Sequence, residues 1–170
     1  LRLRANDGAA MGDDHRLGVI EFYGAEDTGS TYSIGARIQA IARDAWDGSN
    51  NDADLEFYTT DGTTESKVLT LDADKLATFA GDVYINNATT SSATQGGKLV
   101  LEADDEAAMA NAHRLGVIEF KGAEDGSSTM SIGARIEAIA RDAWDGSNND
   151  ANLAFYTTNG TTESRILALD

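Results

Sequence analysis

The sequence repeats itself with a period of 98 residues. Residues 1–72 align with residues 99–170 without a gap, and 54 of the 72 aligned positions are identical. The run His15–Phe22, for example, recurs unchanged as His113–Phe120. A repeat of this kind encodes one structural module twice. We therefore predict that the two copies have near-superimposable folds and stack along one axis. A two-domain protein with a duplicated domain of any function is the alternative.

The repeat also suggests the domain boundaries. We expect a first module at 1–85, a polar linker or neck at 86–98, and a truncated second copy at 99–170. The linker consists mainly of Ser, Thr, Asn, Gln and Gly, a composition typical of connecting segments. The sequence begins at Leu1 without a signal-like segment, so we expect it to be part of a longer protein.

Charge and cysteine content exclude several classes of function. The formal net charge is −16, which argues against a nucleic-acid-binding face and against anionic membrane surfaces. The absence of cysteine excludes disulfides, thiolate catalysis and cysteine-ligated zinc. No stretch approaches the ~20 apolar residues of a membrane-spanning helix, so we expect no membrane insertion.

The content of large apolar residues is low. Leu, Ile, Val and Phe account for 33 of the 170 residues, about 19%. With the high charge, this lies near the compositional border of disorder, roughly 20%. A monomer of this kind would bury too little apolar surface to offset its chain entropy. Because strand patterns are nevertheless clear, we predict that burial occurs between chains, in an obligate homotrimer.

Most of each repeat has the pattern of short β-strands. Val19 to Tyr23 is β-branched and aromatic, and residues 55–71 read as a hairpin closed at Asp61-Gly62. Residues 76–84 suggest two short strands broken at Ala80-Gly81. The openings of the repeats, at 1–4 and 99–101, have the same strand-like character. The predicted fold class is all-β, an elongated intertwined trimeric fibre of tandem strand-rich repeats.

The segment Ser33–Trp46 fits two structures. As a strand, it places one apolar set on a single face, with only Ile41 out of place: Ile34, Ala36, Ile38, Ala40 and Ala42. As a helix, it has an apolar stripe at Ile34, Ile38, Ile41 and Ala45, and its alanines favour a helix. We prefer the strand because its neighbours are strands and a turn-forming stretch follows at 47–52.

The order of motifs resembles a known family. The succession is Gly18–Phe22, Ile34–Ala40, Leu55–Thr60, Glu65–Asp72 and Ala77–Val83. It resembles the shaft of tailed-phage tail fibres and related virion appendages, a family often associated with an autoproteolytic chaperone domain. The resemblance implies a homotrimer wound into a β-rich shaft, located in a virion appendage or another extracellular fibre. Its implied work is host attachment or spacing.

The Asx-rich loop at 47–54, repeated at 145–152, is the candidate metal site. Its weak candidate ligands are Asp47, Asn51, Asp145 and Asn149, since oxygen ligands at alternate positions suit calcium. The loop fails the EF-hand pattern, which requires Gly at the sixth position and an acid at the twelfth. We expect calcium to be at most a minor stabiliser, and no other cofactor. His15 and His113 are expected to be structural rather than metal ligands.

Six residues are candidates for the interface between chains: Ile34, Ile38, Trp46, Ile132, Ile136 and Trp144. We expect Trp46 and Trp144 to anchor packed chains, while stacking on a host glycan is the alternative. The arginines are expected to pair with carboxylates of other chains; they are Arg37, Arg43, Arg135 and Arg141.

The sequence contains no catalytic motif of a known class. It has no nucleophile elbow, phosphate-binding glycine loop or HExxH, and carboxylate pairs are too common to indicate a glycosidase. We therefore predict a structural segment, not an enzyme. Its expected partners are itself, other fibre or virion proteins and a host surface glycan. The alternative function is a glycan-binding adhesin module of a phage or bacterial filament.

Overall fold

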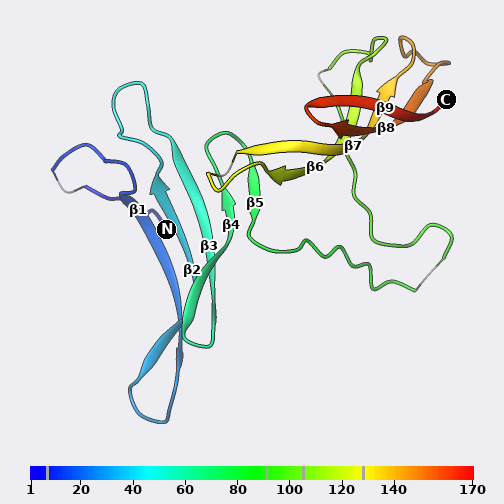
Figure 1. Ribbon diagram of the computed structural model, residues 1–170. Coiled ribbons are helices and arrows are strands. Elements are labelled where there is room, and N and C mark those ends of the chain that lie inside the picture. The colour runs from blue at the N-terminus through cyan, green and yellow to red at the C-terminus, as the bar shows by residue number, and fades with distance from the viewer. Residues whose placement is uncertain (7, 91, 105, 128) are drawn as a thin grey trace. The chain divides into compact units, whose positions relative to one another are not determined.

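The computed structural model describes residues 1–6, 8–90, 92–104, 106–127 and 129–170, and in these ranges it is all-β. The chain divides into two compact units, Leu1–Tyr84 and Ile85–Asp170, each built on one antiparallel sheet (Figure 1). The division counts the polar segment 86–98 with the second unit. The described residues contain no helix long and apolar enough to cross a membrane.

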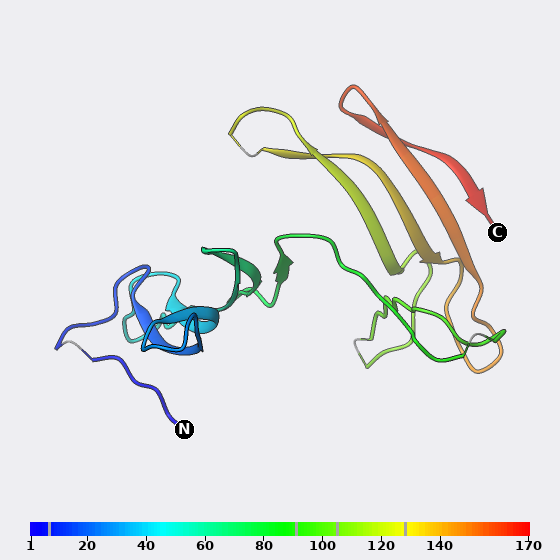
Figure 2. The same ribbon diagram turned by 90° about the horizontal axis from the view of Figure 1, so that it is seen from below.

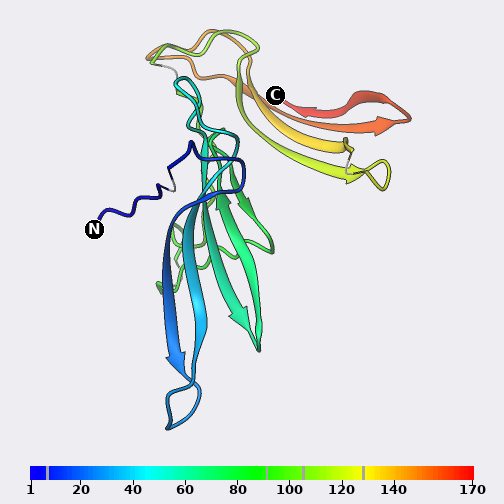
Figure 3. The same ribbon diagram turned by 90° about the vertical axis from the view of Figure 1, so that its left-hand side faces the viewer.

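The first unit is a five-stranded meander. Its strands are β1 (Arg16–Ala25), β2 (Tyr32–Ala42), β3 (Ala53–Asp61), β4 (Thr64–Leu71) and β5 (Ala77–Phe79). They lie in the order β1-β2-β3-β4-β5, with every neighbouring pair antiparallel. Figure 3 shows β1 to β4 side by side as one curved layer. All connections join adjacent strands, so the sheet forms from local contacts.

The second unit repeats four of these strands. They are β6 (Arg114–Ala123), β7 (Met130–Ala140), β8 (Ala151–Asn159) and β9 (Thr162–Leu169), in the order β6-β7-β8-β9 (Figure 2). Every strand boundary and every bulge is displaced by 98 residues from its counterpart in the first unit. The prediction of equal folds is confirmed, whereas stacking along one axis stays a prediction.

The segment Ser33–Trp46, whose pattern fitted both a strand and a helix, forms strand β2 as far as Ala42. Its ladder ends at Ala42, after which the chain turns so that the Trp46 amide donates to the Met11 carbonyl at 2.8 Å. The predicted hairpin at 55–71 is confirmed as β3 and β4. Gly62 closes it with φ 59°, a left-handed conformation that favours glycine.

Two local predictions were wrong. Of the two short strands expected in 76–84, only Ala77–Phe79 forms, because β5 pairs with β4 alone and the chain then leaves the sheet. The openings at 1–4 and 99–101 are not strands, because their backbone has no ladder partner among the described residues. They pack on the sheet through side chains instead.

Leu3 packs against Gly18 of β1, and Leu101 packs against Gly116 of β6 in the same way. A Cβ atom placed on Gly18 would lie 2.7 Å from the Leu3 Cβ, and one on Gly116 would lie 2.8 Å from the Leu101 Cβ. Both distances are below van der Waals contact. Glycine at these positions therefore lets the opening segment of each repeat cross its sheet closely.

We expect Gly18→Ala to displace Leu3 and to lower the free energy of unfolding by about 1 kcal/mol, because overpacking forces the neighbours apart. Gly24→Ala is the matched control, since Gly24 lies in the same strand and a Cβ atom added there would have nothing within 4 Å. Urea unfolding of both variants measures the effect. Equal stability of the two variants would contradict the close packing.

Candidate functional site

One face of each sheet carries a continuous apolar row. In the first unit, Cα pairing aligns one residue from each strand: Ile20, Ile38, Phe57, Leu69 and Phe79. The second unit has the same row over four strands: Ile118, Ile136, Phe155 and Leu167. Ile20 is 38% exposed and Phe79 is 52% exposed. No large side chain in the described part of the chain is fully buried, so this apolar face is largely uncovered.

The predicted composition of this face needs one correction. The apolar face includes four of the five predicted residues: Ala36, Ile38, Ala40 and Ala42. Ile34 is not on this face, because Phe22 pairs with Ala36 and the next residue of β1 pairs with Ile34. The extra residue in β2 is Gly35. It shifts the register so that Ile34 lies on the opposite face.

The second unit contains the same shift. There Ile132 pairs with Lys121 and lies on the face opposite to that of Ile136. The interface role predicted for both isoleucines stays a prediction. Ile20, Phe57, Leu69 and Phe79 were not singled out from the sequence, although their alternation within short strands is the signal that marks them.

The opposite face of the first sheet is polar and more buried. Gln39 is 5% exposed and Glu56, which pairs with it across β2 and β3, is 8% exposed. Glu56 accepts hydrogen bonds from Gln39 Nε2 at 2.8 Å, from Tyr58 Oη at 2.7 Å and from Lys67 Nζ at 2.7 Å. Burial raises the pKa of Glu56, but these three donors outweigh it and hold the pKa below its ordinary value.

The second sheet also has one buried carboxylate on its polar face, but this carboxylate lies on β7 instead of β8. Glu137 replaces Gln39, and Ala154 replaces Glu56. Glu137 Oε2 accepts from Arg114 Nε and from Arg135 Nη1, both at 2.8 Å. Each sheet therefore keeps one central carboxylate with cationic partners, as burial of a charge requires.

We expect Glu56→Ala to lower the free energy of unfolding by roughly 1–2 kcal/mol, since Gln39, Tyr58 and Lys67 lose their shared acceptor. The double variant Gln39→Glu/Glu56→Ala reproduces the pairing of the second unit and should recover most of this loss. Gln39→Glu alone is the control and should also be destabilised, because it places two carboxylates side by side. Thermal unfolding of the three variants tests the idea, and a double variant no more stable than Glu56→Ala would refute it.

Three of the four arginines that were expected to pair with carboxylates of other chains pair with carboxylates of their own chain instead. Arg37 pairs with Glu65 at 2.7 Å and its guanidinium lies 4.1 Å from the centre of the Tyr58 ring. Arg43 pairs with Asp74 at 2.8 Å. Arg135 pairs with both Glu137 and Glu163, at 2.8 and 2.9 Å. These carboxylates are supplied by the same chain, so the pairs form without chain association.

Trp46 and Trp144 anchor loops of their own chain. Trp46 Nε1 donates to the Asp52 carbonyl at 2.9 Å, and Trp144 Nε1 donates to the Asp150 carbonyl at the same distance. Both side chains are half-buried. Their polar edges are thus committed within the chain, while the predicted roles in a chain interface or in glycan stacking stay predictions.

The candidate calcium loop is closed by hydrogen bonds to one carboxylate. Asp47 Oδ1 accepts from the Ser49 amide at 2.7 Å, from the Ser49 hydroxyl at 2.9 Å and from the Asn50 amide at 2.9 Å. These donors lower the pKa of Asp47. Asp145 makes the same contacts in the second unit. Asn51 and Asn149 take no part in these bonds, so the geometry is that of an Asx turn.

Both histidines accept a hydrogen bond from a backbone amide three residues earlier and so stabilise turns. His15 Nδ1 accepts the Gly12 amide at 3.1 Å, and His113 Nδ1 accepts the Ala110 amide at 3.2 Å. The His15 carbonyl accepts the Ala42 amide at 2.9 Å, which ties the turn to the end of β2. The described residues contain no group of three or more His, Cys, Asp or Glu side chains arranged to hold a metal.

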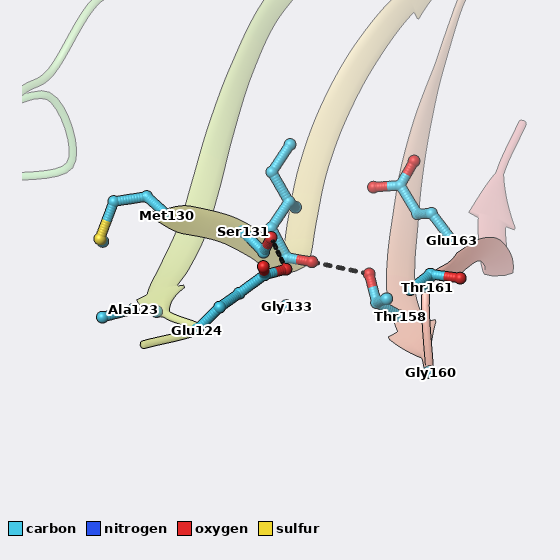
Figure 4. Close-up of a pocket in the computed structure, with 11 residues that line it drawn as sticks. Ala123, Glu124, Met130, Ser131, Gly133, Thr158, Gly160, Thr161 and Glu163 are labelled. Atoms are coloured by element: carbon cyan, nitrogen blue, oxygen red, sulfur yellow. Dashed lines mark hydrogen bonds between the residues drawn. The ribbon is translucent and has the colours of Figure 1, made fainter. Parts of the chain in front are cut away.

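A groove lies at the hairpin end of each unit, between the β1–β2 loop and the β3–β4 turn. In the first unit its volume is about 440 Å³, and its lining includes Tyr23, Tyr32, Ile34, Thr60 and Glu65. In the second unit the corresponding groove includes Met130, Ile132, Thr158 and Glu163 (Figure 4). The Thr158 hydroxyl donates to the Ile132 carbonyl at 2.8 Å. Figure 4 shows Ser131 bonded to Glu124. The first groove is the one flanked by aromatic rings.

No family model and no curated protein matches this chain. Two solved structures that are similar to it come from one phage fibre. The carboxy-terminal domain of the bacteriophage T5 L-shaped tail fibre with its intramolecular chaperone domain has a TM-score of 0.70 at 11% identity, covering 98% of this chain and 56% of that one. The carboxy-terminal domain of the same fibre has a TM-score of 0.68 at 9% identity, covering 98% of this chain and 80% of that one.

At these identities the likeness concerns the fold. The expected resemblance to a phage tail fibre is confirmed at that level, over nearly the whole chain. The chain spans little more than half the length of the first of these structures.

Proposed function

We propose that this chain is a structural segment of a homotrimeric phage tail fibre or a similar extracellular fibre, with no chemistry of its own. It acts as a spacer in a virion appendage that carries the host-attachment parts, and its partners are two further copies of itself and other fibre proteins. The likeness in fold to the T5 tail fibre supports this role.

The uncovered apolar face carries the proposal. A sheet is stable only when its apolar face packs against another layer. Here the row through Ile38 is half-exposed in a single-layer sheet. The buried apolar residues in the described part of the chain are few, and apart from Met11 they are alanines. Three copies around a common axis would turn these faces toward one another and supply the missing core. The number three rests on the tail-fibre likeness.

A comparison of the two repeats supports the same arrangement. Every residue of the apolar row in β1 to β4 recurs unchanged in β6 to β9. Differences on the sheets fall mainly on the polar face, as at Gln39/Glu137, Glu56/Ala154 and Thr70/Ala168. An identical apolar face in both modules is expected if both pack in the same way along one fibre.

Light scattering coupled to size-exclusion chromatography tests the proposal. We expect a folded particle of about 54 kDa, three times the 18.0 kDa mass of the chain. A folded particle with the mass of one chain would refute self-association. A mass of two chains would keep the apolar interface but overturn the trimer.

A further inference from the structure

We propose that the outer edge of β9 in the second unit is a docking site for an extended peptide segment of the kind found at residues 73–79 in the first unit. The segment adds an antiparallel strand to the sheet and brings one acidic side chain with it. This surface is an edge of the sheet, whereas the proposed trimer uses the apolar face. At the repeat offset of 98, the positions equivalent to 73–79 lie after Asp170.

The backbone of β9 is open to a further strand. In the first unit, β5 covers the outer edge of β4, and the central residue pair of this contact is Thr70 with Thr78. Among the described residues β9 is the last strand of its sheet, so its outer edge has no such neighbour. The N–H and C=O groups of an uncovered edge are a template for an added strand.

Exposure at this edge differs between the two units although the residues are the same. Leu69 of β4 is half-buried, whereas its counterpart Leu167 of β9 is 50% exposed. Leu71 is 40% exposed, and its counterpart Leu169 is 53% exposed. Because β5 is what the first unit has and the second lacks among the described residues, a similar strand fits the apolar edge of the second unit.

A buried oxygen atom gives an independent sign that a backbone donor belongs beside β9. In the first unit, Asp54 Oδ1 accepts a hydrogen bond from the Ala73 amide at 3.3 Å. Asn152 occupies the equivalent position in the second unit, and its Oδ1 is buried without a hydrogen-bond partner among the described residues. An unpaired buried acceptor is unfavourable, and a docked segment would bring a backbone amide to it.

The acidic end of the segment also has a matching group. Arg43 pairs with Asp74 at 2.8 Å in the first unit. Arg141 occupies the position of Arg43, and it forms no ion pair in the described part of the second unit. Such an exposed pair adds little affinity, but it favours a segment with an acid three residues before the paired strand.

These three features together define the occupant. It is an extended segment in which an acid is followed by Lys-Leu-Ala-Thr-Phe, as at residues 74–79. Its Phe side chain would continue the apolar row beyond Leu167, as Phe79 continues that row beyond Leu69. The first unit thus shows how the segment sits, and the second unit offers the same edge.

Disulfide trapping tests the site on the full chain, which has no cysteine of its own. The probe is a synthetic peptide of residues 73–83 that carries Thr78→Cys. Directly opposed residues of neighbouring strands lie within the Cα separation that a disulfide spans, so Ala168→Cys should capture the peptide. The matched control is Thr70→Cys, the equivalent position in the first unit, where β5 already occupies the edge. We expect the intact mass in a glutathione buffer to show at least tenfold more capture at position 168.

Variants of the peptide and of the chain test the mode of binding. Phe79→Asp in the peptide and Asn152→Ala in the chain should each reduce capture severalfold, because they remove the apolar contact and the buried acceptor. Equal capture at positions 70 and 168, equal capture of a scrambled peptide, or no effect of Phe79→Asp would overturn the inference. Light scattering shows that the proposed assembly can fail separately: a trimer without capture would refute only the docking site, and capture by a single 18.0 kDa chain would refute only the trimer.

Discussion

Replacing Ile38 with aspartate is expected to abolish assembly. Ile38 is the second residue of the apolar row that crosses the first sheet, between Ile20 and Phe57. In the proposed trimer the change would place three carboxylates in the shared core. An unpaired buried charge costs several kcal/mol per site, which is large against the ~5–15 kcal/mol that stabilises an ordinary domain.

Light scattering coupled to size-exclusion chromatography measures this effect directly. Ile136→Asp should behave in the same way, since Ile136 holds the equivalent place in the second unit. Val83→Asp is the matched control, because it adds the same charge at an exposed side chain outside the sheet. Arg2→Ala should also change little. A normal trimer from Ile38→Asp would mean that the apolar face is not the interface.

Replacing Trp46 with alanine is expected to lower the free energy of unfolding by about 2–3 kcal/mol and leave the oligomeric state unchanged. Truncation of a fully buried Trp costs about 3–5 kcal/mol, and Trp46 is half-buried. The indole also holds the 47–52 loop through its bond to the Asp52 carbonyl. For a unit of this size the loss corresponds to a fall in Tm of roughly 10 °C or more.

Trp46→Phe is the control, because it keeps one aromatic ring but removes the indole N–H and part of the ring system. Its loss should be smaller than that of Trp46→Ala but at least about 1 kcal/mol, the usual contribution of one hydrogen bond. Thermal unfolding and light scattering together separate two roles of Trp46. Lower stability at an unchanged mass would favour a loop anchor within the chain, and dissociation into monomers would favour an anchor between chains.

The strands could be predicted because their signals are local. The β-branched and aromatic runs around Ile20 and Phe57 alternate with polar residues, and Asp61-Gly62 marks the turn between β3 and β4. The gap-free alignment of residues 1–72 with residues 99–170 indicated that one folded module occurs twice in the chain. Low apolar content against clear strands pointed to a core completed by other chains, and the exposed row at Ile38 agrees with that reasoning.

The faces of the sheet could not be predicted in full. Strict alternation assigns Ile34 to the face of Ile38, but one extra residue at Gly35 reverses it. A bulge of one residue leaves no distinct pattern in a segment rich in Gly and Ala, because its position depends on which partner residues pair. The same limit hid the groove lined by Tyr23 and Tyr32, since the register of β1 and β2 decides that both side chains line it.

The sequence alone thus determined the class of fold, the number of modules and the shortage of core within one chain, because composition, periodicity and repetition are properties of short segments. Only the tertiary structure decided that Arg37 meets Glu65 and that Leu3 packs closely on Gly18. It also decided that Glu56 pairs with Gln39 across the first sheet, whereas Glu137 pairs with Ala154 across the second. Those contacts join residues far apart along the chain, and their geometry follows from strand register, which no local pattern encodes.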